Sequence, residues 1–281
     1  HTLAARAHVR ASCAIFTRHC ACQTAFARAC SQMIVFDTRL FDLAAHLQRI
    51  PVTHNSVPLP LLHRDQPALR LMPPRRRKFR VSFSGDCTNA LRANVHAALH
   101  GFGPSRVRPC GTKVPVKQWA QEVANSNFTL APSGTFPPTF MMYEAMLLGS
   151  IPVFVFSPAS YTHHRDRERV MRRAEHLTTD DIDRLMPYYV RSLRIRPAPA
   201  RLVYAFRCHS TRSQDEGFRF SRLGLFVSHT SAANITSAIA QAEPSVLARV
   251  AYLERWQRRF TLSSTFDYVQ AHVARYSSLW V

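Results

Sequence analysis

Acidic residues and lysine are both scarce in this chain of 281 residues. It contains 17 aspartates and glutamates against 37 lysines and arginines, and only Lys78, Lys113 and Lys117 are lysines. The net charge of +20 favours anionic partners such as nucleic acid, anionic lipid, acidic glycans or nucleotide diphosphates. The arginines are spread along the chain among many alanines, a pattern that a biased base composition of the gene also produces.

The sequence also lacks any run of about 18 apolar residues free of charge, so it has no obvious membrane span. It contains no internal repeat. Because 46% of its residues are hydrophobic, global disorder is excluded, and the length suffices for one large or two smaller domains. The chain begins at His1 rather than at Met, so we expect it to be part of a longer protein whose targeting segment lies outside it.

Metal ligands are not grouped in a recognisable pattern. Seven cysteines are present, and four lie in the first thirty residues: Cys13, Cys20, Cys22 and Cys30. No second ligand pair lies at zinc-finger spacing, so buried free thiols are expected, with a disulfide among these cysteines as the alternative in an oxidising lumen. The run His163-His164 with Asp166 and Glu168 is interpreted as a solvated loop, and we predict no metal site.

Proline marks the best domain boundary. Residues 1–50 are interpreted as helical, with a short strand at Met33–Phe36. Residues 51–74 contain six prolines and precede the basic run Arg75 to Lys78, which is typical of an extended linker. We therefore predict two parts, a partial N-terminal lobe with its linker over 1–74 and a complete lobe over 75–281.

Strands and helices alternate after this boundary. The patterns predict strands at Phe79–Phe83, Phe128–Ala131, Ile151–Phe156 and Leu223–Val227. They predict helices at Thr88–His100, Val116–Asn125, Thr139–Leu148, Asp180–Ser192, 231–242, 245–258 and Thr265–Tyr276, the third of them stopped by Gly149. Such alternation indicates an α/β fold with a parallel sheet covered by helices on both faces.

Ligands of open α/β sheets bind where strands end and helices begin. Gly85 follows the first of these strands and leads into the helix that carries Arg92. The turn Ser133-Gly134 follows the second strand and leads into the helix that carries Glu144. A glycine turn before a helix suits phosphate, an arginine can bind phosphate in a bidentate manner, and a carboxylate can accept both hydroxyls of a ribose.

Two motifs stand in the central segment: residues 126–134 read SNFTLAPSG, and residues 143–153 read YEAMLLGSIPV. With these motifs the segment resembles the exostosin family of glycosyltransferases (glycosyltransferase family 47). Residues 78–85 with Arg92, the stretch 57–60, residues 218–227 and residues 260–269 resemble further parts of the family pattern. The likeness thus extends from about residue 51 to residue 275.

The resemblance implies two Rossmann-like lobes, the N-terminal, acceptor-side lobe being truncated in this chain. The donor-binding residues that it implies are Gly85, Arg92, Ser133, Gly134 and Glu144, with Glu144 on the ribose and Gly85, Arg92 and the Ser133-Gly134 turn facing the diphosphate. His229 is added as a donor-binding candidate because it follows the late strand, from where its side chain can point into the cleft. The resemblance also implies a nucleotide-sugar donor, with UDP-sugar favoured, inversion at the anomeric carbon, no covalently bound cofactor and no metal requirement. The acceptor would be a glycan or glycoprotein, in the Golgi or endoplasmic reticulum lumen, with a partner transferase as a further expectation.

The sequence departs from the family pattern at three positions where arginines are expected: Ser133, Pro137 and Met141. No acidic residue follows the late strand near His229, and no catalytic base is assigned. These departures support an alternative, a catalytically decayed protein that binds nucleotide or glycan or assists an active transferase. A nucleic-acid-binding protein is a third alternative, but no recognised module is present and we predict no specific nucleic-acid partner.

Other aromatic residues and modification motifs receive structural interpretations. Trp119 and Trp256 lie in helical patterns and are assigned to the core rather than to sugar platforms. Two tripeptides, beginning at Asn127 and Asn234, match the N-glycosylation pattern. Because Asn127 lies on a predicted buried strand, we do not expect it to be modified.

Overall fold

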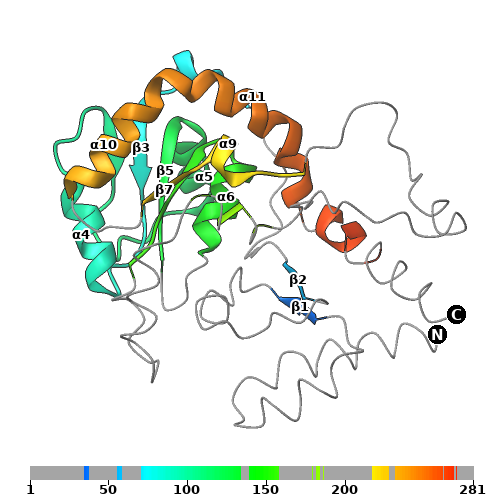
Figure 1. The fold of residues 1–281 in the computed structure, drawn as a ribbon. Helices are drawn as coiled ribbons and strands as arrows, with labels where there is room; N and C mark the ends of the chain where they lie inside the picture. Colours follow the sequence, from blue (N-terminus) through cyan, green and yellow to red (C-terminus); the bar gives the residue numbers. More distant parts are fainter. Residues whose placement is uncertain are drawn as a thin grey trace, which may run out of the picture.

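The computed structural model describes residues 71–133, 139–157, 217–227, 232–261 and 263–268, the short segments 35–37 and 56–58, and a few single positions. A parallel sheet flanked by helices forms the centre of this part of the chain (Figure 1). Two further strands, β1 (Val35–Asp37) and β2 (Ser56–Pro58), pair in parallel as a separate small sheet.

The central sheet has five strands: β3 (Phe79–Phe83), β4 (Ser105–Val107), β5 (Ser126–Pro132), β6 (Ile151–Val155) and β7 (Leu225–Val227). Their order across the sheet is β4-β3-β5-β6-β7, and every neighbouring pair is parallel. The first strand of the sheet therefore lies between the second and the third, which is the flavodoxin-like order of doubly wound folds.

Apolar residues explain the central position of β5 and β6. All five residues of β6 are buried, and six of the seven residues of β5 are buried. Strands buried on both faces read as continuous apolar runs, because helices cover both sides of a parallel sheet. The hydroxyl groups of Ser82, Thr129 and Ser150 form a hydrogen-bonded chain across β3, β5 and the start of β6, so these buried polar atoms are satisfied.

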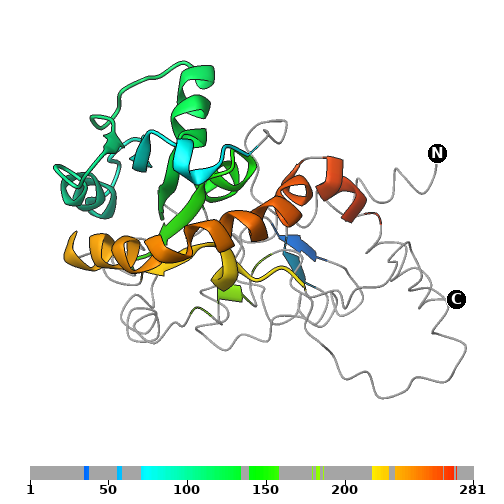
Figure 2. The same cartoon turned by 90° about the horizontal axis from the view of Figure 1, so that it is seen from above.

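Helices cover both faces of the sheet. On one face lie α4 (Ala90–Ala98), α10 (Ala232–Ala242) and α11 (Val246–Trp256), with α10 packed against both α4 and β7. On the other lie α5 (Val116–Ala124) and α6 (Phe140–Leu147), which share an apolar cluster. The view from above in Figure 2 separates α10 and α11 from α5 and α6.

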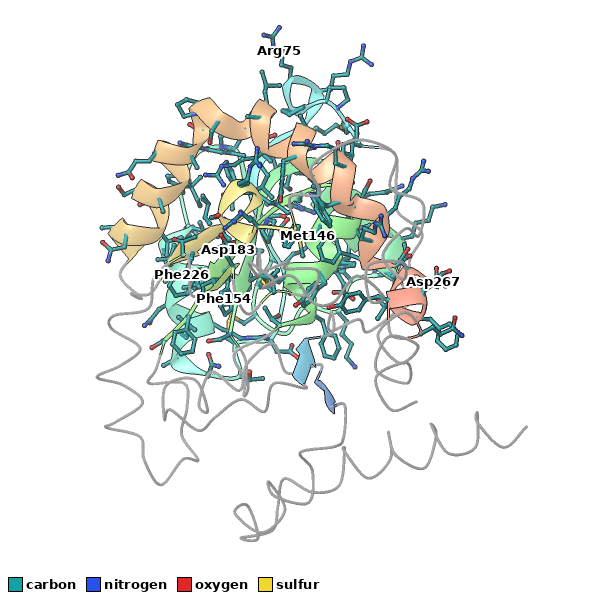
Figure 3. The ribbon with its side chains drawn as sticks, turned by 45° about the vertical axis from the view of Figure 1, so that its right-hand side comes forward. Arg75, Met146, Phe154, Asp183, Phe226 and Asp267 are labelled. Atoms are coloured by element: carbon teal, nitrogen blue, oxygen red, sulfur yellow. A yellow bond between two sulfur atoms is a disulfide. The ribbon has the colours of Figure 1, made fainter. Side chains whose placement is uncertain are left out.

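The buried core lies between these layers. Met146 of α6 and Phe154 of β6 are almost completely buried, whereas Arg75 projects from the end of the molecule where the strands begin (Figure 3). Trp119 and Trp256 both pack into apolar clusters, as predicted. Within the described residues, no helix has the length and apolar character needed to cross a bilayer.

Most predicted elements of the sheet lobe are confirmed with boundaries shifted by one or two residues. The strand at Phe79–Phe83 is confirmed without change. The final helix, predicted over Thr265–Tyr276, begins at residue 263. It is described as far as residue 268 and again at residue 270. The predicted helices over 1–50 and near Asp180–Ser192 lie largely outside the described residues.

Three predictions need correction. The edge strand β4 was not predicted, because the four residues between Gly103-Pro104 and Pro109 resemble a loop, and only pairing with β3 makes three of them a strand. Ser56–Pro58, interpreted as part of a linker, pairs with β1. The strand predicted from Leu223 starts only at Leu225, because Phe220–Leu223 forms a short helix, α9.

Candidate functional site

The strand order predicts a ligand-binding crevice at the carboxyl edge of the sheet. From β3 the chain crosses to β4 on one side, and from β5 it crosses to β6 on the other. Helix α4 follows β3 and helix α6 follows β5, so the two helices cover opposite faces of the sheet. Their amino-terminal ends therefore diverge above the gap between β3 and β5. In open α/β sheets ligands bind at this switch point. The turns predicted to hold a donor, Ser84-Gly85 and the segment after Pro132, follow these two strands.

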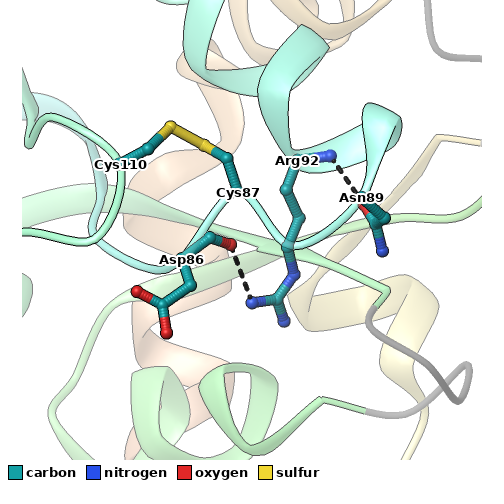
Figure 4. Close-up of a disulfide and its surroundings, with 5 residues drawn as sticks. All are labelled: Asp86, Cys87, Asn89, Arg92 and Cys110. Carbon is teal, nitrogen blue, oxygen red and sulfur yellow. Dashed lines mark hydrogen bonds between the residues drawn. A yellow bond between two sulfur atoms is a disulfide. The ribbon is translucent and has the colours of Figure 1, made fainter.

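Arg92 lies at the α4 side of this crevice. Asn89 caps α4, since its side-chain oxygen accepts a hydrogen bond of 3.0 Å from the Arg92 backbone N–H. The Arg92 Nη1 donates to the backbone oxygen of Asp86 at 3.3 Å (Figure 4), while its buried Nε has no hydrogen-bond partner. Burial lowers the pKa of Arg92, and the nearby Asp86 carboxylate partly offsets this. A half-buried guanidinium with an unused N–H can bind an anion.

Ser133 links the two sides of the crevice through its backbone. Its carbonyl accepts a 3.4 Å hydrogen bond from Asn89 Nδ2, and its N–H donates to Val155 O at 2.8 Å. The residue is completely buried. Since the backbone N–H of Ser133 is occupied in the sheet, this group is not offered to a phosphate.

Glu144 lies on α6 and is only 7% exposed, so it is not an ordinary solvated helix residue. It lines a cavity of about 230 Å³ together with Ser84 from the end of β3. Trp119, Val114 and Met141 add apolar walls to this cavity. Its volume is below the ~300–1,000 Å³ of complete ligand pockets, so it matches one portion of a larger ligand.

Gly85 is not required by the local backbone or packing. A Cβ added at this position would lie 3.8 Å from Arg92 Nη1 and from the Phe83 ring, which is ordinary contact. The absence of a side chain therefore leaves free space at the turn between Ser84 and Asp86. Gly134 and His229, the two remaining predicted donor-binding residues, lie outside the described residues.

A disulfide joins Cys87 and Cys110 beside this turn (Figure 4). The expectation of free thiols is wrong for these two cysteines. Parallel pairing aligns Phe83 of β3 with Val107 of β4, so the loops that leave the two strands run side by side. The Cα atoms of the two cysteines are 5.3 Å apart, within the usual range for disulfides. Because β4 was not predicted, the sequence offered no reason to pair them.

Sequence reasoning missed several residues that the fold brings to the site. Asn89 bridges α4 and Ser133, and Ser84 faces the cavity of Glu144. Asn is a preferred helix-capping residue, so Asn89, the second residue of the helix predicted over Thr88–His100, could have been identified as its cap. Trp119 is a core residue, as predicted, but it also lines the cavity. In the described part of the chain, no group of three or more His, Cys, Asp and Glu side chains gathers as metal ligands would.

Fold and site together define a doubly wound parallel α/β protein with a candidate ligand site at its switch point. The sequence model of the Exostosin GT47 domain matches residues 7–175, which is more than half of the chain, and the chain therefore belongs to this family of glycosyltransferases. The match contains the segment 126–153, which carried the resemblance. It begins at residue 7, well before residue 51, where the resemblance seen in the sequence began. The resemblance noted over residues 218–275 lies beyond the matched region and stays a prediction. No curated protein and no solved structure matches the chain.

Proposed function

We propose that this chain transfers a sugar from a nucleotide donor, a UDP-sugar in preference, to a glycan or glycoprotein acceptor with inversion at the anomeric carbon. One observation carries the proposal: the buried Glu144 and Ser84 of the β3 turn line the same cavity, beside the crevice where Arg92 lies. Membership of a glycosyltransferase family supports the reaction class. The predicted lobes, 1–74 and 75–281, would supply the acceptor and donor sides respectively.

In this proposal each group meets a different part of the donor. The Glu144 carboxylate accepts hydrogen bonds from the ribose hydroxyls, and the apolar wall around Trp119 contacts the nucleoside. Arg92 and the amino end of α4 face the diphosphate, where a guanidinium and the helix dipole both favour negative charge. Gly85 leaves the space that the phosphate oxygens need.

The proposed chemistry proceeds without a covalent intermediate. The acceptor hydroxyl oxygen forms a bond to the anomeric carbon while the bond from that carbon to the diphosphate oxygen breaks. A base takes the hydroxyl proton, and the nucleoside diphosphate leaves. Arg92 would stabilise the charge that develops on the departing diphosphate. The base is not assigned among the described residues.

The disulfide supports a location in the secretory pathway. Disulfides persist in oxidising compartments and are rare in the cytosol. The bridge between Cys87 and Cys110 therefore favours the Golgi or endoplasmic reticulum lumen, where we propose that the protein acts on its acceptor, alone or with a partner transferase. Fractionation of cells that express the full-length gene tests this part of the proposal.

Isothermal titration with UDP and GDP tests the donor site. Glu144→Gln should weaken UDP binding by roughly 10–100-fold, because a buried carboxylate that accepts ribose hydroxyls contributes roughly 1.5–3 kcal/mol. Gly85→Ala should also weaken it without lowering the melting temperature, since the added methyl group meets only ordinary contacts. Failure of the wild-type protein to bind either nucleotide would overturn the proposal.

A second candidate function is nucleotide or glycan binding without transfer. Met141 lines the cavity near a position where the family pattern has an arginine, and the Ser133 N–H is occupied by Val155 O. Both features reduce the positive field around a departing diphosphate. Incubation with a panel of sugar nucleotides separates the two functions, because UDP binding without either hydrolysis or transfer would favour the second.

A further inference from the structure

Two loops contribute to the wall of the cavity of about 230 Å³ at the crevice. Ser84 lies in the turn between β3 and α4, whereas Thr112 lies in the loop between β4 and α5. Other lining residues are held by the helices, since Val114, Trp119 and Met141 belong to the apolar cluster that α5 and α6 share. The distance between the two loop walls therefore depends on what holds Thr112 near Ser84.

Few contacts join these two loops. The pairing of β3 with β4 ends at Phe83, whose carbonyl accepts a hydrogen bond from Arg108 N–H at 3.0 Å. Beyond this point the described residues of the two loops share one backbone hydrogen bond, from Gly111 N–H to Gly85 O. Its length of 3.4 Å is long for such a bond. The disulfide is therefore the strongest connection between the two loops.

The loop after β4 has little packing of its own. All residues from 109 to 113 are exposed. Within the loop, Thr112 N–H donates to Pro109 O at 3.1 Å, which closes a turn but does not attach the loop to the rest of the molecule. Segments with few buried apolar contacts open at a low free energy. Without the cross-link this loop would therefore move away from Ser84 while the sheet stays folded.

The disulfide also restrains the segment that orients Arg92. Cys87 lies between two residues that contact Arg92 (Figure 4). On one side, the backbone oxygen of Asp86 accepts a hydrogen bond from the Arg92 guanidinium at 3.3 Å. On the other side, Asn89 caps α4 through the Arg92 backbone N–H. The cross-link therefore acts on both parts of the proposed site, the cavity for the nucleoside and the guanidinium that faces the diphosphate.

We propose that the disulfide between Cys87 and Cys110 is a positioning cross-link of the donor site. It holds the loop after β4 against the turn after β3, and nucleotide affinity depends on it. This role rests on the proposed function, because UDP is the ligand whose binding the cross-link controls.

The cross-link also makes donor binding sensitive to reduction. Cys110 is exposed and Cys87 is half-buried, so reagents in solution can reach the bridge. A dithiol reductant breaks the S–S bond by supplying one electron and one proton to each sulfur, and it is itself oxidised to a disulfide. Both cysteines then carry free thiols, and the loop after β4 is released.

The test measures UDP and uridine affinity by isothermal titration for oxidised wild type, for wild type reduced with dithiothreitol, and for the Cys87→Ser, Cys110→Ser double variant. All are titrated at a temperature where the oxidised wild type is fully folded, and circular dichroism follows the fold of each. UDP affinity should fall about tenfold in the reduced and double-variant proteins, the factor expected if the loop keeps its bound arrangement about a tenth of the time. Uridine affinity should fall by a similar factor, because the loop borders the nucleoside cavity, and re-oxidation should restore both.

Two controls isolate the effect of this disulfide. Dithiothreitol should not change the affinity of the double variant, since the chain has seven cysteines and the remaining ones would otherwise account for the effect. Gly101→Ala lowers stability at a position of positive φ in the turn after α4, where no atom lies within 4 Å of the added Cβ. It should leave both affinities unchanged.

The outcomes separate this role from the proposed function. Oxidised wild type that binds no UDP would overturn both. If oxidised wild type binds UDP and the reduced and double-variant proteins bind it equally tightly, the positioning role alone is overturned. It is also overturned if the sheet unfolds on reduction, or if Gly101→Ala weakens binding as much as the double variant does, because affinity would then follow stability. Should the double variant not fold, the reduced wild type provides the same comparison.

Discussion

Individual arginine side chains differ in the groups that accept hydrogen bonds from their guanidinium N–H atoms. Arg106 and Arg108 share the carboxylate of Glu122, and the Arg249 guanidinium binds three backbone carbonyls at the end of α9. Arg92 and Arg77 each keep a buried N–H without a partner. Arginines that keep an unsatisfied N–H donor, rather than arginines in general, therefore mark the positions where an anion would be stabilised.

Replacement of Arg92 by Gln should lower UDP affinity by roughly 10–100-fold, since a hydrogen bond to a charged group contributes about 1.5–3 kcal/mol. Affinity for uridine, which has no phosphate, should not change. Arg258→Gln, at an exposed position of the 3-10 helix η7 (Gln257–Phe260), serves as the control for lost charge. If titration shows that uridine and UDP lose affinity equally, Arg92 does not contact the diphosphate.

At the scale of elements, the ends of α6 determine where Glu144 lies. Thr139 caps the start through a 3.3 Å hydrogen bond from the Met141 N–H. At the other end, Gly149 N–H donates to Met146 O and Ser150 N–H to Ala145 O, the paired bonds of a Schellman motif. Gly149 has a φ of +88°, which confirms its predicted role as helix stop.

Gly149→Ala should destabilise the protein by about 2 kcal/mol, measured by denaturant unfolding. The new Cβ would lie 2.6 Å from Leu71 Cδ2 on a backbone of positive φ. Gly101→Ala is the matched control, because Gly101 has a φ of +81° but no atom within 4 Å of the added Cβ. It should cost only about 1 kcal/mol. Equal losses for both variants would show that Leu71 moves aside freely.

The Glu122 cluster connects α5 to the edge strand β4 and its following loop. Burial alone would raise the pKa of Glu122, but the hydrogen bonds from Arg108 and Arg106 and the attraction of their charges together outweigh burial and lower it. A carboxylate with a lowered folded-state pKa stabilises the fold above its unfolded pKa of about 4.3. That stabilisation is lost as the pH falls through the folded-state pKa.

Glu122→Gln should therefore reduce the free energy of unfolding by roughly 1–3 kcal/mol at pH 7. The difference from wild type should shrink as the pH falls below about 4.3. Urea unfolding at several pH values measures both effects. Glu254→Gln, at an exposed position of α11, should leave the pH dependence of wild type unchanged. A difference from wild type that is independent of pH would contradict an ionic role for Glu122.

At the scale of the whole molecule, the disulfide restricts the unfolded chain. Cys87 and Cys110 are separated by 23 residues. Closing a loop of this size is expected to contribute roughly 3 kcal/mol to stability. The Cys87→Ser, Cys110→Ser double variant should therefore melt at a lower temperature than wild type. Reductant should lower the melting temperature of the wild type to nearly that of the variant. A variant with the same melting temperature as the oxidised wild type would contradict this role of the disulfide.

Much of the sheet lobe could be predicted because its local signals are strong. The apolar run Ile151–Val155, the helix that contains Glu144 and the stop at Gly149 all follow from residue pattern. The edge strand β4 could not be predicted, since three half-buried residues carry no periodic signal. The short helix α9 was missed because Arg249, which binds its terminal carbonyls, lies more than twenty residues away.

The sequence by itself determined the α/β class, the order of most elements and the family, because apolar periodicity and the motif over 126–153 are local properties. It also indicated Glu144 and Arg92 as candidate site residues, which stays a prediction. Only the tertiary structure decided the strand order β4-β3-β5-β6-β7, and with it the switch point beside Asn89, the pairing of Cys87 with Cys110 and the cavity lined by Ser84 and Glu144. Each of these depends on contacts between segments distant in the chain, which no local pattern of residues encodes.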